Sequence, residues 1–295
     1  MRRSLGAGLV VGLSAALALA TVLVVRDVGS TTRVTVHRVT VHRATTVAAP
    51  IPPRALTVSS WGDSMASETS KFLSGALDQQ TTTHITFESH SFPGTSVCNY
   101  VDSGDIATDA SSVEPDVVVL QFSGDLFTAC ASRLGKGRPL ADYAQMSAGD
   151  VKAAIETYLR QDPQLAHVVV LLPPPSSPGG TQAYITLLDA DYEIMVRALR
   201  DPRVRVASGP AASVSKPDGA FTWTLPCTHQ EKLAGVCLGA GRVNTVRSPT
   251  GHFCIPTSCA GFQPGAWRYV NAEAKDLLAP YGITIHTTIA SGYAS

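Results

Sequence analysis

Two runs of apolar, mostly β-branched residues place the strongest constraint on how this chain folds. Residues 116–122 read Asp-Val-Val-Val-Leu-Gln-Phe, and residues 167–172 read His-Val-Val-Val-Leu-Leu. Neither run alternates polar with apolar residues, so both faces of each strand must be covered. Shorter runs at 55–60, 84–87 and 203–207 also have the composition of strands. This pattern predicts a buried parallel sheet.

Amphipathic segments alternate with these strands. Apolar residues recur at helical spacing in 65–78, 147–160, 181–200 and 264–279. Strands that alternate with helices indicate an α/β fold in which a parallel sheet lies between two helical layers, giving three α/β/α layers. In such folds we expect the functional site at the carboxyl ends of the strands.

Residues 1–26 have the features of a transmembrane anchor. Arg2 and Arg3 precede an apolar run from Leu5 to Val25, and about 20 apolar residues suffice to cross a bilayer core. The arginines favour a cytoplasmic N-terminus, so we expect a single-pass protein of the cell membrane with an extracytoplasmic C-terminal domain. A cleaved signal sequence is the alternative, because residues 18–20 read Ala-Leu-Ala, and the protein would then be secreted.

Residues 27–54 are typical of an extracytoplasmic linker. The motif Arg-Val-Thr-Val-His occurs at 33–37 and again at 38–42, and prolines follow at 50, 52 and 53. This segment is too short and too charged to form a core, and its prolines favour a stiffened spacer. The main domain is therefore expected at 55–290.

The cysteine content agrees with export. An even number of cysteines in an extracytoplasmic domain favours disulfides, and sequence proximity selects among the pairings. We expect Cys227–Cys237, Cys254–Cys259 and, for the remaining two, Cys98–Cys130. A zinc site is the alternative, which the lack of any Cys-x-x-Cys spacing disfavours.

The charge balance excludes one class of partner. Lys plus Arg and Asp plus Glu are equal at 23 each, so no net positive field attracts nucleic acid. No motif implies a cofactor, and we expect neither a cofactor nor a bound metal. The oligomeric state is left open.

The segment between the first strand and the first helix carries the first candidate for chemistry. It contains Gly62, Asp63 and Ser64. Glycine permits a tight turn, and a serine at a helix N-terminus faces backbone N–H groups that can stabilise an oxyanion. The same tripeptide is also typical of a simple helix cap, so the rest of the chain must decide.

Four segments together resemble the motif blocks of the SGNH (GDSL-type) hydrolases, in the order of that family. Gly-Asp-Ser at 62–64 resembles block I and Phe-Pro-Gly-Thr-Ser at 92–96 resembles block II. Phe-Ser-Gly-Asp at 122–125 resembles block III, and Arg-Ser-Pro-Thr-Gly-His-Phe-Cys at 247–254 resembles block V. The likeness is greatest to exported and membrane-anchored actinobacterial members, and it implies the flavodoxin-like SGNH fold.

The resemblance also implies site residues. Ser64 takes the place of the nucleophile and His252 that of the general base. The oxyanion hole would consist of the backbone N–H groups of Ser64 and Gly94 and the block III side chain at Asp125.

Two positions depart from the family pattern. Block III has Asp125 where the family has asparagine, and an ionised carboxylate cannot donate a hydrogen bond to an oxyanion. The family also has aspartate three residues before the histidine, where this chain has Pro249. We therefore expect no local carboxylate to orient His252, and Ser248, Thr250 or a backbone carbonyl would have to substitute.

These observations favour an extracytoplasmic serine ester hydrolase or acyltransferase that acts on an acyl ester, with acylated cell-envelope carbohydrate as one candidate substrate. A catalytically impaired SGNH-like domain that binds an envelope glycan or a protein partner is the alternative. A structural protein outside this family is the third interpretation.

Overall fold

The computed structural model describes residues 55–79, 83–126, 128–245, 248, 250–254 and 263–285. The expected anchor at 1–26, the linker at 27–54 and the last residues of the expected domain at 55–290 lie outside this range. Within the described part, no helix is both long and apolar enough to cross a lipid bilayer.

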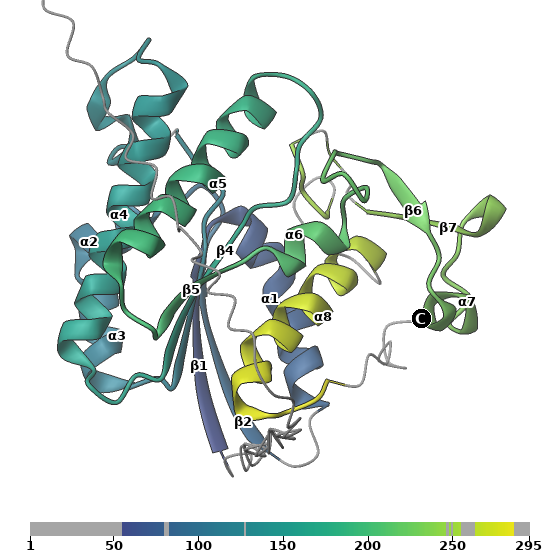
Figure 1. Ribbon diagram of the computed structural model, residues 1–295, viewed down its shortest axis with the longest axis horizontal. Coiled ribbons are helices and arrows are strands. Elements are labelled where there is room, and N and C mark those ends of the chain that lie inside the picture. The colour runs from purple at the N-terminus through teal and green to yellow at the C-terminus, as the bar shows by residue number, and fades with distance from the viewer. Residues whose placement is uncertain are drawn as a thin grey trace, which may run out of the picture. The chain divides into compact units, whose positions relative to one another are not determined.

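A five-stranded parallel sheet forms the centre of the fold (Figure 1). Its strand order is β2-β1-β3-β4-β5, which is the doubly wound order of flavodoxin-like proteins. The strands are β1 (Ala55–Gly62), β2 (His84–Ser91), β3 (Val117–Gln121), β4 (His167–Leu171) and β5 (Val204–Ala207).

Helices cover both faces of the sheet, as Figure 1 shows. On one face α1 packs beside α8, and α6 contacts α8. On the other face lie α2, α3, α4 and α5. The bounds are α1 (Ser64–Asp78), α2 (Val97–Ser103), α3 (Asp105–Ser112), α4 (Leu140–Gln161), α5 (Gly180–Leu199), α6 (Gly209–Ser213), α7 (His229–Leu233) and α8 (Pro264–Leu278). The expected three-layer α/β/α arrangement is confirmed.

Each face of the sheet has its own hydrophobic core. The run at 117–120 is fully buried, and its residues alternate between the two cores, with Val117 and Val119 in one and Val118 and Leu120 in the other. This explains why the sequence shows no polar alternation in β3, because both faces of the strand need apolar side chains.

Several elements differ from the expectation. Helix α4 begins at Leu140 rather than near residue 147, and β2 continues to Ser91 beyond the apolar run. β2 is an edge strand, so its second half carries polar side chains that no apolar periodicity reveals. The short helices α2 and α3 were not expected. They are separated by Gly104 in the left-handed conformation (φ 81°).

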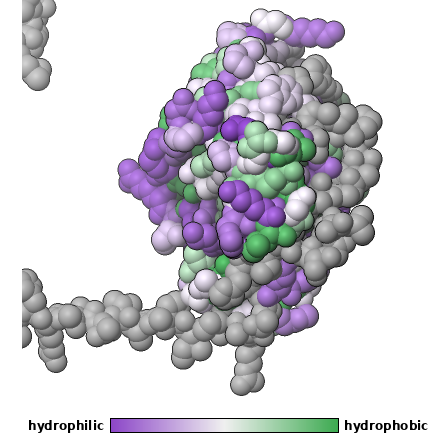
Figure 2. All heavy atoms as spheres, turned by 90° about the vertical axis from the view of Figure 1, so that its right-hand side faces the viewer, coloured by the Kyte–Doolittle hydropathy of each residue, from purple (hydrophilic) through white to green (hydrophobic). Residues whose placement is uncertain are grey.

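A small excursion follows α6. It contains the antiparallel pair β6 (Thr224–Pro226) and β7 (Arg242–Asn244), with α7 between them. Figure 2 views the molecule from the side of this excursion and shows polar and apolar surface interleaved there. The excursion is closed by the disulfide Cys227–Cys237, which confirms that prediction.

Candidate active site

The turn from β1 to α1 places Ser64 at the first position of the helix. Asp63 is the N-cap, and its Oδ1 accepts a hydrogen bond of 2.9 Å from the backbone N–H of Met65. Gly62 is required here, because a Cβ would lie 2.1 Å from the Cβ of Ala66 and 2.6 Å from the carbonyl oxygen of Gln121. Asp63 therefore caps the helix and leaves Ser64 at its N-terminal end.

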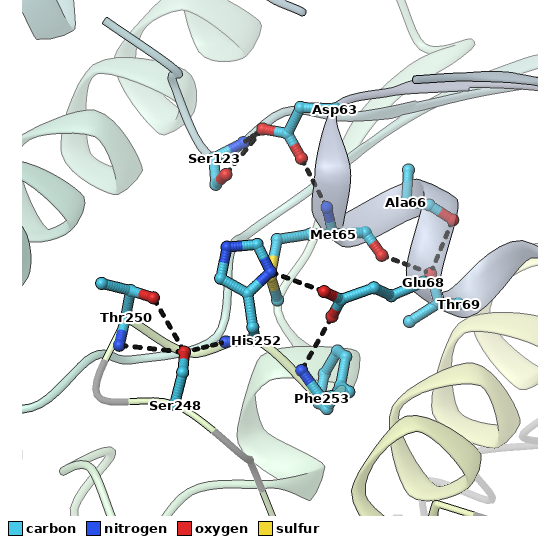
Figure 3. A network of polar contacts seen from close by, with 10 residues as sticks. All are labelled: Asp63, Met65, Ala66, Glu68, Thr69, Ser123, Ser248, Thr250, His252 and Phe253. Carbon is cyan, nitrogen blue, oxygen red and sulfur yellow. Dashed lines mark hydrogen bonds and ion pairs between the residues drawn. The ribbon is translucent and has the colours of Figure 1, made fainter. Parts of the chain in front are cut away.

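Asp63 also joins this turn to the end of β3. Its Oδ2 accepts hydrogen bonds of 2.6 Å from both the backbone N–H and the hydroxyl of Ser123 (Figure 3). The side chain is fully buried. Burial raises the pKa of Asp63, although the hydrogen bonds from Ser123 and Met65 oppose the shift. Blocks I and III are thus held together by one carboxyl group.

His252 lies beside α1 and contacts a carboxylate there. Its Nδ1 is 2.7 Å from Oε1 of Glu68, and the other oxygen of Glu68 accepts a 2.8 Å hydrogen bond from the backbone N–H of Phe253. Figure 3 shows the Glu68 carboxylate between these two groups. The Glu68 side chain is 7% exposed and the His252 side chain 32% exposed.

This contact defines the state of the imidazole. An ionised carboxylate can only accept hydrogen bonds, so Nδ1 carries a proton, and in the neutral imidazole Nε2 then has the lone pair of a general base. The hydrogen bond to Glu68 raises the pKa of His252 above its ordinary value, although partial burial opposes the shift. The charges of Asp63 and Asp125 act in the same direction as Glu68.

Helix geometry relates this pair to Ser64. Glu68 follows Ser64 by four residues in α1, and residues four apart lie on the same face of a helix, one turn along the axis. The imidazole held by Glu68 therefore lies along the face on which the helix begins with Ser64. Within the described residues, the Ser64 hydroxyl has no hydrogen bond to His252. Their direct approach stays a prediction.

No local carboxylate was expected to orient His252, and among the described residues the substitutes expected in its place do not bind the ring. Ser248, one of the expected substitutes, accepts a hydrogen bond from the backbone N–H of His252, not from the ring. The partner is instead Glu68, 184 positions away in the sequence. Pro249 lies outside the described residues.

A signal for Glu68 was present in the sequence. The apolar stripe of the first helix includes Met65 and Phe72. Glu68 lies three residues after the first and four before the second, so it occupies the buried face of the helix. A carboxylate at such a position needs a partner. Sequence alone does not identify that partner, because the contact is made across the fold.

The loops that carry Gly94 and Asp125 are fastened to each other. The hydroxyl of Ser96 donates a hydrogen bond to the backbone carbonyl of Asp125, and the disulfide Cys98–Cys130 joins α2 to the segment after β3. The predicted Cys98–Cys130 disulfide is thus confirmed. Gly94 has a φ of 74°, a conformation that favours glycine. The oxyanion roles of Ser64, Gly94 and Asp125 stay predictions.

The structure describes the predicted disulfide between Cys254 and Cys259 only in part. Cys254 is disulfide-bonded and 3% exposed, but Cys259 lies outside the described residues. The bond at Cys254 restrains the chain two residues after His252.

Comparisons with known proteins give similar structures but no similar sequence families. No family model matches the chain, and no curated protein matches it. A catalytic mutant of Axe2, an acetylxylan esterase from Geobacillus stearothermophilus, is similar over 79% of this chain and 97% of its own, with 10% identity and a TM-score of 0.48. A lipase/acylhydrolase from Enterococcus faecalis is similar over 57% of this chain and 87% of its own, with 12% identity and a TM-score of 0.38.

A third similar structure is the lipase Lip_vut3 from a goat rumen metagenome. It is similar over 54% of this chain and 82% of its own, with 11% identity and a TM-score of 0.41. These solved structures are described as a lipase/acylhydrolase, a lipase and an acetylxylan esterase. Likenesses of this size identify no activity for this chain, so the residues of the site must carry any functional conclusion.

Proposed function

We propose that this chain is a serine ester hydrolase or acyltransferase in which Ser64 is the nucleophile, His252 the general base and Glu68 the positioning residue. The contact between Glu68 and His252, one helical turn from Ser64, carries the proposal. It supplies the carboxylate that the sequence around His252 lacks, and it leaves Nε2 as the basic nitrogen.

The chemistry is acyl transfer in two steps. Nε2 of His252 removes the proton of Ser64 as Oγ attacks the ester carbonyl carbon, and the imidazolium then protonates the departing alcohol. The acyl group stays on Ser64 as an ester. A water molecule or an acceptor hydroxyl then attacks this ester while His252 takes its proton. The imidazolium returns that proton to Oγ as the bond to the acyl group breaks, which restores Ser64 and the neutral histidine. Glu68 stabilises the imidazolium that forms in each step.

The oxyanion would be stabilised at the N-terminus of α1. The backbone N–H of Ser64 lies there, and the loop of Gly94 is fastened to the loop of Asp125 by Ser96 and by the disulfide. Fixed N–H donors of this kind stabilise developing charge without reorganising during the reaction. Asp125 weakens the arrangement, because an ionised carboxylate beside the oxyanion repels it.

We further propose an extracytoplasmic location, on a membrane anchor formed by residues 1–26 or as a secreted protein after signal cleavage. Two disulfides support it, because such bonds persist mainly in oxidising compartments. The substrate would then be an acyl ester found outside the membrane, with acylated cell-envelope carbohydrate as the preferred class. Phe92, 61% exposed and two residues before Gly94, offers an aromatic surface for a sugar ring.

The test is covalent trapping together with turnover. The full chain should hydrolyse a small acyl ester and react with a fluorophosphonate, which adds its phosphonyl group to Oγ of Ser64 and releases fluoride. Mass spectrometry of the labelled peptide should place the adduct on Ser64. Ser67→Ala, three residues along the same helix, should retain both activities, whereas Ser64→Ala should lose both. Phe92→Ala should raise KM for an acylated oligosaccharide without changing turnover of the small ester.

Two results would contradict the proposal. One is an adduct on a residue other than Ser64. The other is hydrolysis that never exceeds the Ser64→Ala blank on any acyl ester or acylated oligosaccharide. Binding of an envelope glycan without turnover would instead support the alternative of an impaired, glycan-binding domain.

A further inference from the structure

A second cluster of ionisable side chains lies toward the carboxyl end of β2, just before the block II loop at 92–96. Glu88 and His90 are two residues apart on β2, so they point to the same face of the sheet. Asp109 reaches them from α3. Nε2 of His90 is 3.4 Å from Oδ1 of Asp109 and 3.9 Å from Oε2 of Glu88.

Two atoms at the centre of this cluster are buried, and apart from their 3.4 Å approach to each other neither has a hydrogen-bond partner among the described residues. They are Nε2 of His90 and Oδ1 of Asp109, and the Asp109 side chain is 2% exposed. Buried polar atoms that lack a hydrogen bond are unfavourable in a protein interior. A cation placed between them would accept a lone pair from both.

We propose that Glu88, His90 and Asp109 bind one divalent transition-metal ion of the zinc type, at a site separate from Ser64 and His252. Zinc bonds to imidazole nitrogen and carboxylate oxygen are about 2.0–2.2 Å long. Two such bonds at a tetrahedral angle place the donor atoms roughly 3.4 Å apart, which is the separation between His90 and Asp109. Glu88 is 39% exposed and needs only a small side-chain movement to become the third ligand.

The residues around the cluster hold two of the ligands in place. The second oxygen of Asp109 accepts hydrogen bonds from the hydroxyls of Ser59 and Tyr158. The ring of His90 stacks on Trp61, with centroids 4.2 Å apart and an angle of 17° between the planes. Contacts of this kind orient metal ligands and are a usual feature of metal sites.

There is space for a further ligand. His90 and Asp109 line a cavity of about 250 Å³ together with Trp61, Phe92, Tyr100 and residues of α3. Three protein ligands beside open space match the arrangement of zinc sites that keep one position for water. The ion would link β2 to α3 and would steady the strand that leads into the block II loop at 92–96.

Metal binding to the oxidised full chain tests this proposal. Equilibrium dialysis followed by elemental analysis should give one bound Zn²⁺ per chain. Zinc at about 100-fold above its Kd should raise the thermal midpoint by about 5–10 °C. Co²⁺ should give visible absorption that Zn²⁺ removes. Mg²⁺ should not compete, because it prefers oxygen ligands and retains its water.

Variants distinguish this site from the other histidines of the chain. His90→Gln and Glu88→Gln should each weaken zinc binding by at least about 10-fold, and the half-exposed position of Glu88 makes its replacement safe for folding. His84→Gln, at the exposed start of the same strand, is the matched control and should bind as the native chain does. The proposal fails if the native chain binds no zinc, or if both ligand variants bind it with undiminished affinity.

Discussion

Glu68 contacts Nδ1 of His252 from the helix that begins with Ser64, although 184 positions separate the two residues. In the family that the motifs resemble, the carboxylate precedes the histidine by three residues, and this chain has Pro249 there. The carboxylate that contacts the histidine therefore comes from α1, where Glu68 follows the proposed nucleophile Ser64 by four residues. The segment before His252 contains no carboxylate for the ring, but the folded chain provides one from Glu68.

Replacing Glu68 by glutamine should impair catalysis and shift its pH dependence. His252 must be neutral to accept a proton, and Glu68 raises its pKa. The Glu68→Gln variant should therefore show a rising limb of kcat/KM displaced to lower pH. Its plateau should fall by up to about 10,000-fold, the effect of the equivalent change in serine proteases. The measurement is a pH profile of ester hydrolysis.

A conservative variant separates positioning from folding. Glu68→Asp keeps the charge and should recover part of the plateau as well as the elevated pKa of His252. If Glu68 had only a structural role, the glutamine variant would unfold more easily yet retain the native pH profile. That outcome would remove Glu68 from the mechanism.

The sequence predicted the fold more completely than the site. The apolar runs of β3 and β4 and the stripe of α1 are strong patterns because tertiary packing demands apolar residues on both sheet faces. The short helices α2 and α3 carry weaker patterns, since a helix of one or two turns has few positions from which to read a period. Edge strand β2 is polar in its second half and was predicted too short.

The site residues differ in how far local sequence determines them. Ser64 could be placed from its neighbours, because a glycine turn and a helix start need only a few residues. The partner of His252 could not, because it depends on how α1 lies against the segment before α8. Glu88, His90 and Asp109 were missed for the same reason, since strand and helix bring them together only in the folded chain.

Replacing Asp125 by asparagine should increase esterase activity. The amide can donate a hydrogen bond to the oxyanion where the ionised carboxylate cannot. One such donor is worth about 100- to 1000-fold in rate, so an increase of roughly 10- to 1000-fold is expected. Loss of the negative charge should also lower the pKa of His252. Asp102→Asn, on an exposed position of α2, is the control, and equal rates for both variants would refute the oxyanion role.

Removing the disulfide between α2 and the segment after β3 should affect both stability and activity. The Cys98→Ala/Cys130→Ala variant loses a link across 32 residues, which should lower the free energy of unfolding by about 2–4 kcal/mol. Ester hydrolysis should fall too, because the loops of Gly94 and Asp125 are then less restrained. Urea titration and kinetics of the same preparation measure both effects.

The other described disulfide provides the comparison. Cys227–Cys237 closes a span of only 10 residues in the β6–β7 excursion, so Cys227→Ala/Cys237→Ala should cost less stability and leave ester hydrolysis unchanged. An equal loss of activity in both double variants would mean that the Cys98–Cys130 bond has no particular role in the site.

Glu273 should make the stability of the protein depend on pH. Its side chain is completely buried in α8, and neither carboxyl oxygen has a hydrogen-bond partner among the described residues. Burial raises its pKa from 4.5 to about 8, with a smaller contribution from Asp276. The folded chain therefore keeps this proton at pH values where the unfolded chain has released it.

The sign of the effect follows from this difference in proton binding. Between about pH 4.5 and 8, Glu273 should lower the free energy of unfolding by up to about 1.4 kcal/mol per pH unit as the pH rises. The Glu273→Gln variant should lose this part of the slope, so its stability relative to the native chain should increase with pH.

The constant cost of burying the amide shifts the whole curve of unfolding free energy against pH but not its slope. Glu68 raises the pKa of His252 in both proteins alike, so the difference between their urea-unfolding curves isolates Glu273. Glu114→Gln, at an exposed loop position, should follow the native curve, and parallel curves for the native chain and Glu273→Gln would show that Glu273 is ionised in the folded protein.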